Sequence, residues 1–424
     1  MKRQPITIVQ GGQWGSEAKG AITGYLCQTE AIDICIRTGA VNAGHTVIYD
    51  GSPVKMQQLP VGWVNPNTQL VIGAGAMVHP EILAHECELV SRLTGHNVRD
   101  RLIIDMNAGV HREEHTERST VSGRHHAIGA TGKGCSEAII DKIKGRGAGY
   151  KTFGYIPESN LYNVGDTVAP INNMYNGGQK ILIEGTQGTL LDINTGPYPF
   201  TTHKSTLPGA WMAECGLSPA LPTDIVMVVR TYPIRVAGNS GPMPREISWP
   251  TLAREINAKR ERAGLAPIVE HIAILAFEMA ISEVLSAFEV PPNSDGLNQE
   301  EWWDRSKFRM ALSELNAAAL KYLDSSCVAE LSKLFELTTV TRKLRRVARL
   351  DTNELRRAAM LCRPHRVALT FMNYEFPQYW FECDPHHSLD DRETPYIRNI
   401  ERITEAPIAL VSYGPGPEHI HRRA

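Results

Sequence analysis

The segment from Gly11 to Gly20, with the sequence GGQWGSEAKG, concentrates side chains that suit phosphate chemistry. It follows a short apolar run, Ile6–Val9, and precedes a helix-like stretch, Ala21–Leu26. A strand, a glycine-rich turn, a lysine and then a helix present backbone N–H groups and a cation to a phosphate group. The spacing differs from the Walker A pattern, G-x-x-x-x-G-K-[ST]. The segment is therefore predicted to be a phosphate-binding loop of another type.

Four further blocks carry residues that could take part in nucleotide chemistry. They are NAGHT at 42–46, GATGKG at 129–134, EGTQGTLLD at 184–192 with YPFTT at 198–202, and TTVTRKLRR at 338–346. Taken singly, the histidine could be a solvated surface residue and the second block a plain loop. The basic run could be a solvated face or a nucleic-acid patch.

Composition narrows these alternatives. The chain has 424 residues, 42% of them hydrophobic and 21% charged, as in an ordinary globular protein. A net charge of -2 argues against binding to a nucleic-acid backbone. The eight cysteines form no C-x-x-C pair, which is typical of reduced thiols. No run reaches the roughly 18 apolar residues of a membrane helix, and no signal peptide is evident, so we expect a cytoplasmic protein with no membrane partner.

Short apolar runs interleaved with helical stretches must position these blocks. Several runs are β-branched and end in Gly, Asn or Thr, which predicts an α/β fold with a largely parallel sheet and ligands at the carboxyl ends of its strands. The segment of about 250–337 is predicted to be an α-helical insertion covering one flank of the sheet, within a single domain spanning 1–424. Its expected helices are 252–262, 267–285, 299–322 and 327–335, with a break at 290–296. The expected strands are 6–9, 32–36, 69–72, 102–104, 181–183, 225–229, 367–371 and 408–412.

The first block resembles the phosphate loop of adenylosuccinate synthetases, G-Q-W-G-D-E-G-K-G. The 42–46 block matches that family's N-A-G-H-T signature without a change, and the 184–192 block resembles its E-G-A-Q-G-x-L-L-D. The resemblance implies a P-loop-related α/β fold, with a large, mostly parallel central sheet flanked by helices. It also implies a ligase reaction in which a base oxygen is phosphorylated and the amine of L-aspartate then displaces phosphate.

The resemblance also implies roles around the phosphate donor. His45 would be the general acid in transfer of the γ-phosphoryl group, with Lys19 and Gln187 in the same catalytic set. Gly44 would supply a carbonyl to Mg²⁺, the implied cofactor, and Ser16 stands at a second metal position. The last expected strand ends in SYGP at 412–415, similar to the family's S-x-G-P contact to the donor base. The expected donor contacts are Gly15, Ser16, Glu17, Ala18, Lys19, Gly20, Gly44, His45, Thr46, Asn373, Ser412, Gly414 and Pro415.

For the nucleoside monophosphate, the resemblance implies contacts from several blocks. Asn42 would contact the oxygen being phosphorylated, and Gln187 the base. Thr131 and Thr202 would contact the 5′-phosphate. The set expected for this nucleotide is Ser16, Asn42, Thr131, Gln187, Thr202, Lys343 and Arg146.

Two of these assignments are less direct. Family homodimers reach across with an arginine from D-K-x-x-R-R-G, where this chain reads DKIKGRG at 141–147, so Arg146 or Lys144 would substitute in the expected homodimer. The basic run resembles the aspartate loop, T-T-G-R-x-R-R, whose arginines clamp a dicarboxylate. Lys343 there replaces an arginine near the ribose, and a register shifted by one residue remains open. The aspartate contacts expected are Thr339, Val340, Thr341, Arg342 and Arg345.

Ser16 departs from the family pattern. The family has an aspartate there, which removes the N1 proton of the base and binds Mg²⁺, whereas a hydroxyl is a poor base and a weaker ligand. Either the chain is an inactive nucleotide-binding relative, or its substrate has changed. Guanine carries a 2-amino group beside N1, and a shorter residue makes room for it. Glu17 or a water held by Ser16 would then take the proton.

The same serine resembles the phage branch of the family, the 2-aminoadenylosuccinate synthetases, whose loops read G-S-E-x-K-G. Those enzymes join L-aspartate to dGMP on the route to diaminopurine DNA. The resemblance therefore implies dGMP as substrate and, for a phage protein, the host cytoplasm as its location. A conventional IMP-dependent adenylosuccinate synthetase that tolerates the serine is the alternative.

The donor strand departs as well. Guanine-specific members carry L-T-K-L-D, where the aspartate accepts hydrogen bonds from guanine, and this chain reads LTFMN at 369–373. Asn373 can donate and accept on an adenine edge, so ATP or dATP is the expected donor. A compensating acidic residue such as Glu375 is the alternative. The expected partners are thus dGMP, L-aspartate and ATP or dATP.

Overall fold

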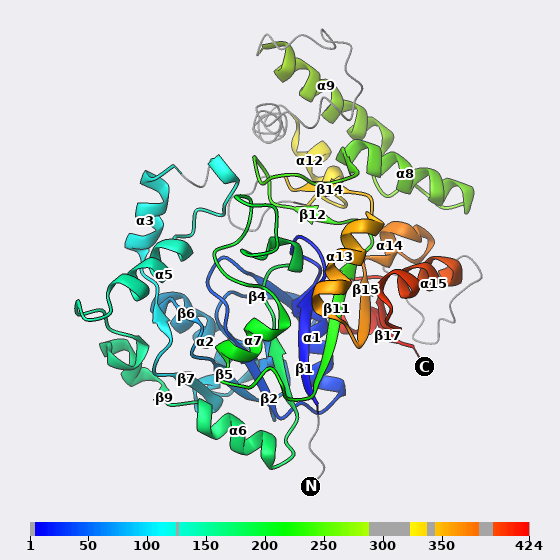
Figure 1. Ribbon diagram of the computed structural model, residues 1–424. Helices are drawn as coiled ribbons and strands as arrows, with labels where there is room; N and C mark the ends of the chain where they lie inside the picture. The colour runs from blue at the N-terminus through cyan, green and yellow to red at the C-terminus, as the bar shows by residue number, and fades with distance from the viewer. Residues whose placement is uncertain (1–4, 124–126, 288–322, 337–343, 381–392, 424) are drawn as a thin grey trace.

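The computed structural model describes residues 5–123, 127–287, 323–336, 344–380 and 393–423. Its centre is a ten-stranded sheet in the order β17-β16-β15-β11-β1-β10-β2-β5-β7-β9, drawn in Figure 1. Every neighbouring pair is parallel except β16 and β17. The strands are β1 (Ile6–Gly11), β2 (Ile34–Arg37), β5 (Gln69–Ile72), β7 (Leu102–Asp105), β9 (Asn163–Gly165), β10 (Ile181–Glu184), β11 (Thr223–Arg230), β15 (Arg366–Thr370), β16 (Ile408–Ser412) and β17 (Ile420–Arg422).

The predicted α/β class and largely parallel sheet are confirmed. All eight expected strands are present, and β9 and β17 are additional edge strands. β2 begins at Ile34 rather than Ile32, and β15 ends at Thr370. Phe371 leaves the strand because its φ is 58°, a left-handed conformation that a parallel ladder cannot continue.

Helices cover both faces of this sheet, which explains why its strands are nearly continuous apolar runs. Ile8 and Ile36 pack with Trp211 on one face, whereas Val9 and Leu182 belong to the cluster on the other. Outside the 250–337 segment, the described helices are α1 (Lys19–Thr29), α2 (Pro80–Thr94), α3 (Glu113–Val121), α5 (Cys135–Lys144), α6 (Val168–Asn176), α7 (Pro208–Glu214), α13 (Thr352–Cys362), α14 (Met372–Glu375) and α15 (Glu393–Thr404).

The 250–337 segment is helical where the structure describes it, but its position differs from the expectation. Helices α8 (Trp249–Arg262), α9 (His271–Ala287) and α12 (Ser325–Leu331) lie beyond one end of the central sheet (Figure 1). They share a core with a small antiparallel sheet, so the described part of the insertion does not cover a flank of the main sheet. The expected helix 299–322 and the break at 290–296 both fall in 288–322, outside the described residues. The small sheet contains β12 (Ile234–Arg235), β14 (Arg346–Ala348) and β13 (Glu246–Ile247).

Shorter elements complete the frame of the site. A hairpin of β3 (His45–Tyr49) and β4 (Ser52–Met56) follows β2, and β6 (Met77–Val78) pairs with β8 (Gly109–Val110). Within the described ranges, no helix is long and apolar enough to cross a membrane. The 3₁₀ turns are η1 (Val61–Val64), η2 (Val98–Arg101), η3 (Phe153–Tyr155), η4 (Pro157–Leu161), η5 (Thr189–Leu191), η6 (Pro377–Tyr379) and η7 (Pro417–His419).

Candidate active site

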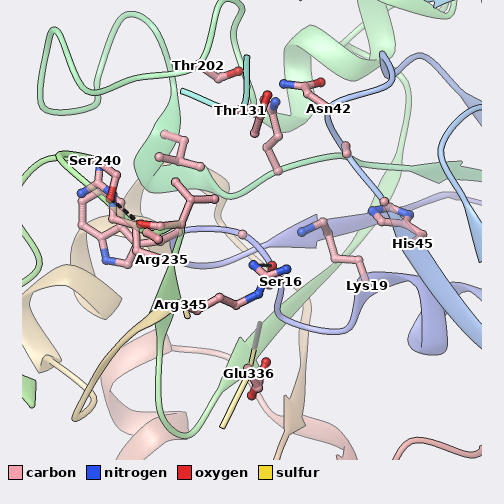
Figure 2. A pocket seen from close by; sticks show the side chains of 18 of the residues that line it. Ser16, Lys19, Asn42, His45, Thr131, Thr202, Arg235, Ser240, Glu336 and Arg345 are labelled. Carbon is pink, nitrogen blue, oxygen red and sulfur yellow. Dashed lines mark hydrogen bonds between the residues drawn. The ribbon is translucent and has the colours of Figure 1, made fainter. Parts of the chain in front are cut away.

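A cavity of about 640 Å³ brings the predicted blocks together. Figure 2 shows Asn42, Thr131 and Thr202 at the top of the view, with Lys19 and His45 below them to the right. Its size is typical of small-molecule sites. The predicted residues that line it are Gly15, Ser16, Ala18, Lys19, Gly20, Asn42, Gly44, His45, Thr46, Thr131, Gln187, Thr202, Arg345, Asn373, Ser412, Gly414 and Pro415.

The phosphate loop gains its shape from left-handed backbone conformations. Gly15, Ser16 and Ala18 have φ of 93°, 59° and 69°. Successive residues of this kind turn backbone N–H groups toward one side, forming a concave anion site. α1 starts directly afterwards at Lys19, so its N-terminus faces the same cavity. The loop therefore has the geometry predicted for phosphate binding.

Glu17 stabilises this loop from beneath. Its side chain is fully buried, and Oε1 accepts hydrogen bonds from the backbone N–H groups of Gln13 (3.1 Å) and Gly15 (2.8 Å). Oε2 pairs with Lys19 Nζ at 2.6 Å. Glu17 lies outside the cavity lining, which favours the other alternative, a water held by Ser16, as acceptor of the substrate proton. Its side chain is therefore turned away from the expected contact with the donor.

Close packing brings the loop against the 42–46 block. A Cβ on Gly20 would lie 2.8 Å from both His45 Cβ and the Thr46 backbone N, so only glycine allows α1 to approach this closely. His45 is buried at the start of β3, with its Nδ1 2.5 Å from Glu184 Oε1. Glu184 only accepts, which favours a proton on Nδ1, whereas the Arg37 guanidinium, which only donates, lies 2.9 Å from the same nitrogen. In either tautomer, Nε2 is the ring nitrogen left for a ligand.

Arg37 completes a buried triad with these two residues. It forms an ion pair with Glu184, and its other nitrogen donates to the Ala43 carbonyl at 2.6 Å, which fixes the turn before His45. Burial and the Arg37 charge lower the pKa of His45 to about 4, although Glu184 raises it. The ligand-free imidazole is thus neutral at pH 7. For the expected general-acid role, it must gain its proton together with the anionic donor.

Asp192 holds the loop that carries Thr202, one of the residues expected to contact the nucleoside monophosphate. This buried carboxylate accepts from the backbone N–H groups of Asn194 (2.9 Å) and Thr206 (2.7 Å), closing the loop that carries Thr202. Gln187 adopts a φ of 61°, and its buried Oε1 has no hydrogen-bond partner among the described residues. A strained backbone together with an unpaired buried acceptor is typical of a residue that binds a ligand.

On the donor side, Glu375, the carboxylate that could compensate for Asn373, is turned away from the cavity. Glu375 lies outside the lining and pairs with Lys259 at 3.1 Å. Asn373 is buried at the cavity wall, and Ser412 Oγ donates to the Gly414 carbonyl at 2.8 Å. Of the carboxylates that line the cavity in the described ranges, Glu336 is the one beside this wall. Both its oxygens are taken, by Arg230 and by the hydroxyl of Tyr374.

The aspartate loop is only partly described. Five expected contacts lie within 337–343, outside the described residues: Thr339, Val340, Thr341, Arg342 and Lys343. Arg345 is described, and Figure 2 shows it reaching Ser16, with Nη1 2.8 Å from Oγ. Arg346 instead pairs with Glu246 at 2.5 Å, in the small sheet. Hence Arg345 reaches the site and Arg346 has a structural partner.

Arg146 lies apart from the cavity. It is exposed just beyond α5, and its Nε donates to the Ile143 carbonyl at 3.0 Å. Arg146 therefore makes no contribution to the site of its own chain. A role for it depends on a second copy of the chain.

The metal expectation rests on few protein ligands. In the part of the chain that the structure describes, no group of three or more His, Cys, Asp or Glu side chains could hold a metal ion. Ser16 and Gly44 line the cavity, but a hydroxyl and a carbonyl are a weak set for a hard cation. They fit Mg²⁺ only if triphosphate oxygens supply most of its coordination.

Sequence reasoning gave no role to several charged groups of the site. Arg37 and Glu184 each close an apolar strand, and the two are direct neighbours in the sheet register. Opposite charges at the ends of two buried strands were the available signal. Lys55 lies opposite Thr46 in the β3–β4 hairpin and lines the cavity, and burial lowers its pKa. Only the hairpin pairing reveals its position.

The fold and site define a class of protein: a nucleotide-binding α/β enzyme with a phosphate loop at the carboxyl ends of a parallel sheet. The adenylosuccinate synthetase family model matches residues 8–154 and 150–375. The chain therefore belongs to the adenylosuccinate synthetase family, which are C–N bond-forming ligases.

Relatives cover most of the chain. It is 29% identical to the adenylosuccinate synthetase of Methanocaldococcus jannaschii over 412 residues, 96% of this chain and 94% of the relative. It is 39% identical to that of Methanococcus maripaludis strain C7 over 247 residues, 57% of this chain and 70% of the relative.

Two solved structures share the fold. Cyanophage S-2L succinoaminodeoxyadenylate synthetase, bound to dGMP and to dATP as an energy donor, matches with a TM-score of 0.69 and 22% identity, covering 99% of this chain and 96% of that one. Fully ligated adenylosuccinate synthetase from Plasmodium falciparum matches with a TM-score of 0.71 and 18% identity, covering 99% and 100%.

Proposed function

We propose that this ligase joins L-aspartate to C6 of dGMP at the expense of ATP or dATP, forming 2-amino-2′-deoxy-N6-succinyl-AMP. The observation that carries the proposal is Ser16. Its hydroxyl stands in the cavity bonded to Arg345, at the position where the family pattern has a carboxylate. A hydroxyl leaves room for the 2-amino group of guanine and can donate or accept a hydrogen bond there.

The reaction proceeds in two balanced steps. The N1 proton leaves guanine, O6 attacks the γ-phosphorus of the donor, and the bond to the ADP or dADP leaving group breaks. The aspartate amine then attacks C6, the C6–O6 bond breaks, and inorganic phosphate carries O6 away as the amine loses its proton. Mg²⁺, when bound, would neutralise charge on the triphosphate.

Residues of the chain supply positioning and proton transfer. Lys19 and the loop N–H groups would bind the donor phosphates, while Arg345 would bind a carboxylate of L-aspartate. His45 Nε2 would face the substrate, because Nδ1 is in contact with Glu184 and Arg37. With Glu17 buried under the loop, a water held by Ser16 is the acceptor that we propose for the N1 proton.

The proposed donor follows from the residue at position 373, where the guanine-reading aspartate of the family is absent. Asn373 takes the position of a guanine-reading aspartate, and Glu375 is turned away to Lys259. GTP would leave its N1–H and 2-amino donors without a carboxylate partner, which costs on the order of 1–3 kcal/mol for each unsatisfied group. We therefore propose ATP or dATP as donor.

Assembly and location follow the same proposal. We propose a homodimer in which Arg146 reaches the substrate phosphate of the second copy, since it has no role in its own cavity. The reaction would take place in the cytoplasm, that of the host if a phage encodes the chain.

IMP is the second candidate substrate. Curated relatives at 29% and 39% identity are named adenylosuccinate synthetases, which favours a conventional reaction with a tolerated serine. A nucleotide-binding protein without catalysis is a poorer candidate, because Lys19, His45 and Gln187 all line one cavity.

One parallel assay separates these candidates. The purified chain is incubated with Mg²⁺, L-aspartate and ATP, with either dGMP or IMP, and phosphate release and the nucleotide product are measured. Turnover of dGMP supports the proposal. Turnover of IMP without dGMP would show a conventional synthetase, and tight nucleotide binding without either reaction would show a non-catalytic relative.

A further inference from the structure

Arg230, at the end of β11, contacts three separate parts of the site. It is among the most deeply buried charged residues, with 1% of its side chain exposed. Such a charge is stable only with partners on every side. Its neighbours lie in the phosphate loop, at the donor-base wall, and at the beginning of the segment that leads into the aspartate loop.

The phosphate loop is held through both the backbone and the side chain of Arg230. Gln13 Nε2 donates to the Arg230 carbonyl at 3.0 Å, and the Arg230 N–H donates to Gln13 Oε1 at 2.9 Å. Nη1 also donates to the carbonyl of Ser16 at 3.4 Å. The peptide that carries Ser16 is thus in direct contact with the guanidinium.

The donor-base wall is the second contact. The guanidinium carbon lies 3.5 Å from the centroid of the Phe371 ring, and Phe371 lines the cavity. Phe371 has a φ of 58°, unusual for a bulky residue. Retaining this conformation costs of order 1–3 kcal/mol, which indicates that the position of the ring matters to the site.

Glu336 is the third contact. Its two carboxylate oxygens accept from both terminal nitrogens of Arg230, and Tyr374 adds a hydrogen bond of 3.1 Å. The backbone carbonyl of Glu336 accepts from Arg345 N–H at 2.8 Å, so Glu336 joins Arg230 to the arginine that faces Ser16. Nη1 is shared between Ser16 and Glu336 over two long bonds, and either can shorten when the guanidinium moves.

We propose that Arg230 is a positioning residue that couples the donor-base site to the L-aspartate site. A purine on Phe371 fixes the plane of the guanidinium, and the guanidinium fixes Glu336 and therefore Arg345. We infer that both ligands favour the same position of the guanidinium, so each tightens binding of the other by the same factor. This inference rests on the proposed function for the identity of the donor-base and aspartate sites, but not on which monophosphate is the acceptor.

The test is a matrix of initial rates at varied ATP and L-aspartate, with the acceptor nucleotide saturating. The coupling factor is the ratio of the KM for L-aspartate extrapolated to zero ATP to its value at saturating ATP. We expect about 5-fold or more in the wild-type chain. Arg230→Met should reduce the factor to about 1, mainly by raising the KM for L-aspartate at saturating ATP. Arg230→Lys should retain part of it.

Controls separate coupling from a loss of folded protein. Misfolding lowers kcat and leaves KM unchanged, whereas lost coupling raises the KM. Arg254→Met removes an exposed arginine that pairs with Glu278, and should leave the factor at its wild-type value. If Arg230→Met fails to fold, Tyr374→Phe tests the contact through Glu336 and Phe371→Leu tests the contact at the donor-base wall. Each should lower the coupling factor about 2-fold or more.

The outcomes are distinct from those of the substrate assay. The matrix uses dGMP or IMP, whichever is turned over, or equilibrium titration of L-aspartate at increasing ATP if neither reacts. A wild-type factor of 1 overturns the proposal. A folded Arg230→Met protein with an unchanged factor also overturns it. Where that variant does not fold, unchanged factors in both Tyr374→Phe and Phe371→Leu do so.

Discussion

Arg345 Nη1 donates a hydrogen bond of 2.8 Å to Oγ of Ser16, joining residues 329 positions apart in the chain. A carboxylate at position 16 would form an ion pair with this guanidinium. A serine accepts one N–H and brings no negative charge to that contact. The replacement of aspartate by serine at position 16 thus affects the L-aspartate site as well as the base site.

Replacement of Ser16 by aspartate is therefore predicted to harm the dGMP reaction in two ways. Ser16→Asp should lower kcat/KM for dGMP about 100-fold or more, because the carboxylate crowds the 2-amino group and engages Arg345. The KM for L-aspartate should rise. Ser16→Ala is the matched control for loss of the hydroxyl alone and should cost about 10-fold. Full dGMP activity in Ser16→Asp would falsify the steric argument.

Donor selectivity is predicted to depend on Asn373. Asn373→Asp should shift the ratio of kcat/KM for GTP over ATP about 10–100-fold toward GTP, since a carboxylate can accept from both guanine donors. Steady-state rates with each triphosphate measure it. Glu375→Gln is the control, because Glu375 faces Lys259, and its ratio should not move. A shift in the control of the same size would place the guanine-reading group at Glu375 instead.

Buried histidines predict a fall in stability at acid pH. Burial lowers the pKa of His45 and His111 to about 4 and that of His203 to about 3, from an ordinary 6.5. The unfolded chain therefore binds more protons between pH 6.5 and about 4. The free energy of unfolding has its full value above pH 6.5 and decreases as the pH falls through this window.

Denaturant titrations at several pH values measure this slope. His111→Asn should flatten it, because one fewer proton is taken up on unfolding. His96→Gln, at an exposed surface position, is the control and should leave the slope as it is in the wild type. A slope that survives in His111→Asn, His203→Asn and His45→Asn together would contradict the assignment to these groups.

The phosphate loop is predicted to store backbone strain at Ala18. Its φ of 69° disfavours any residue with a Cβ, so Ala18→Gly should stabilise the protein by about 1 kcal/mol. Ala21→Gly, in the regular part of α1, has the opposite expected sign, a loss of roughly 0.5–1 kcal/mol. Thermal unfolding of both variants checks the pair. Equal destabilisation would mean that the loop relaxes when ligand-free.

The pattern of apolar runs was enough to predict the sheet. Eight predicted strands are present because a parallel sheet covered on both faces requires continuous apolar segments, which are visible in the sequence. The insertion was predicted as helical, but its described helices do not lie on the predicted flank of the sheet. Its helices pack on the small sheet of β12, β14 and β13, whose two-residue and three-residue strands are too short to give a periodic signal.

The sequence by itself determined which residues could bind phosphate, because a glycine-rich loop between a strand and a helix is a local arrangement. It also identified Ser16 and Asn373 as departures from the family pattern. Only the tertiary structure decided what surrounds them: Glu17 buried beneath the loop, Glu375 turned to Lys259, and Arg345 bonded to Ser16. These contacts join distant segments, and side-chain direction and burial arise only when the segments pack together.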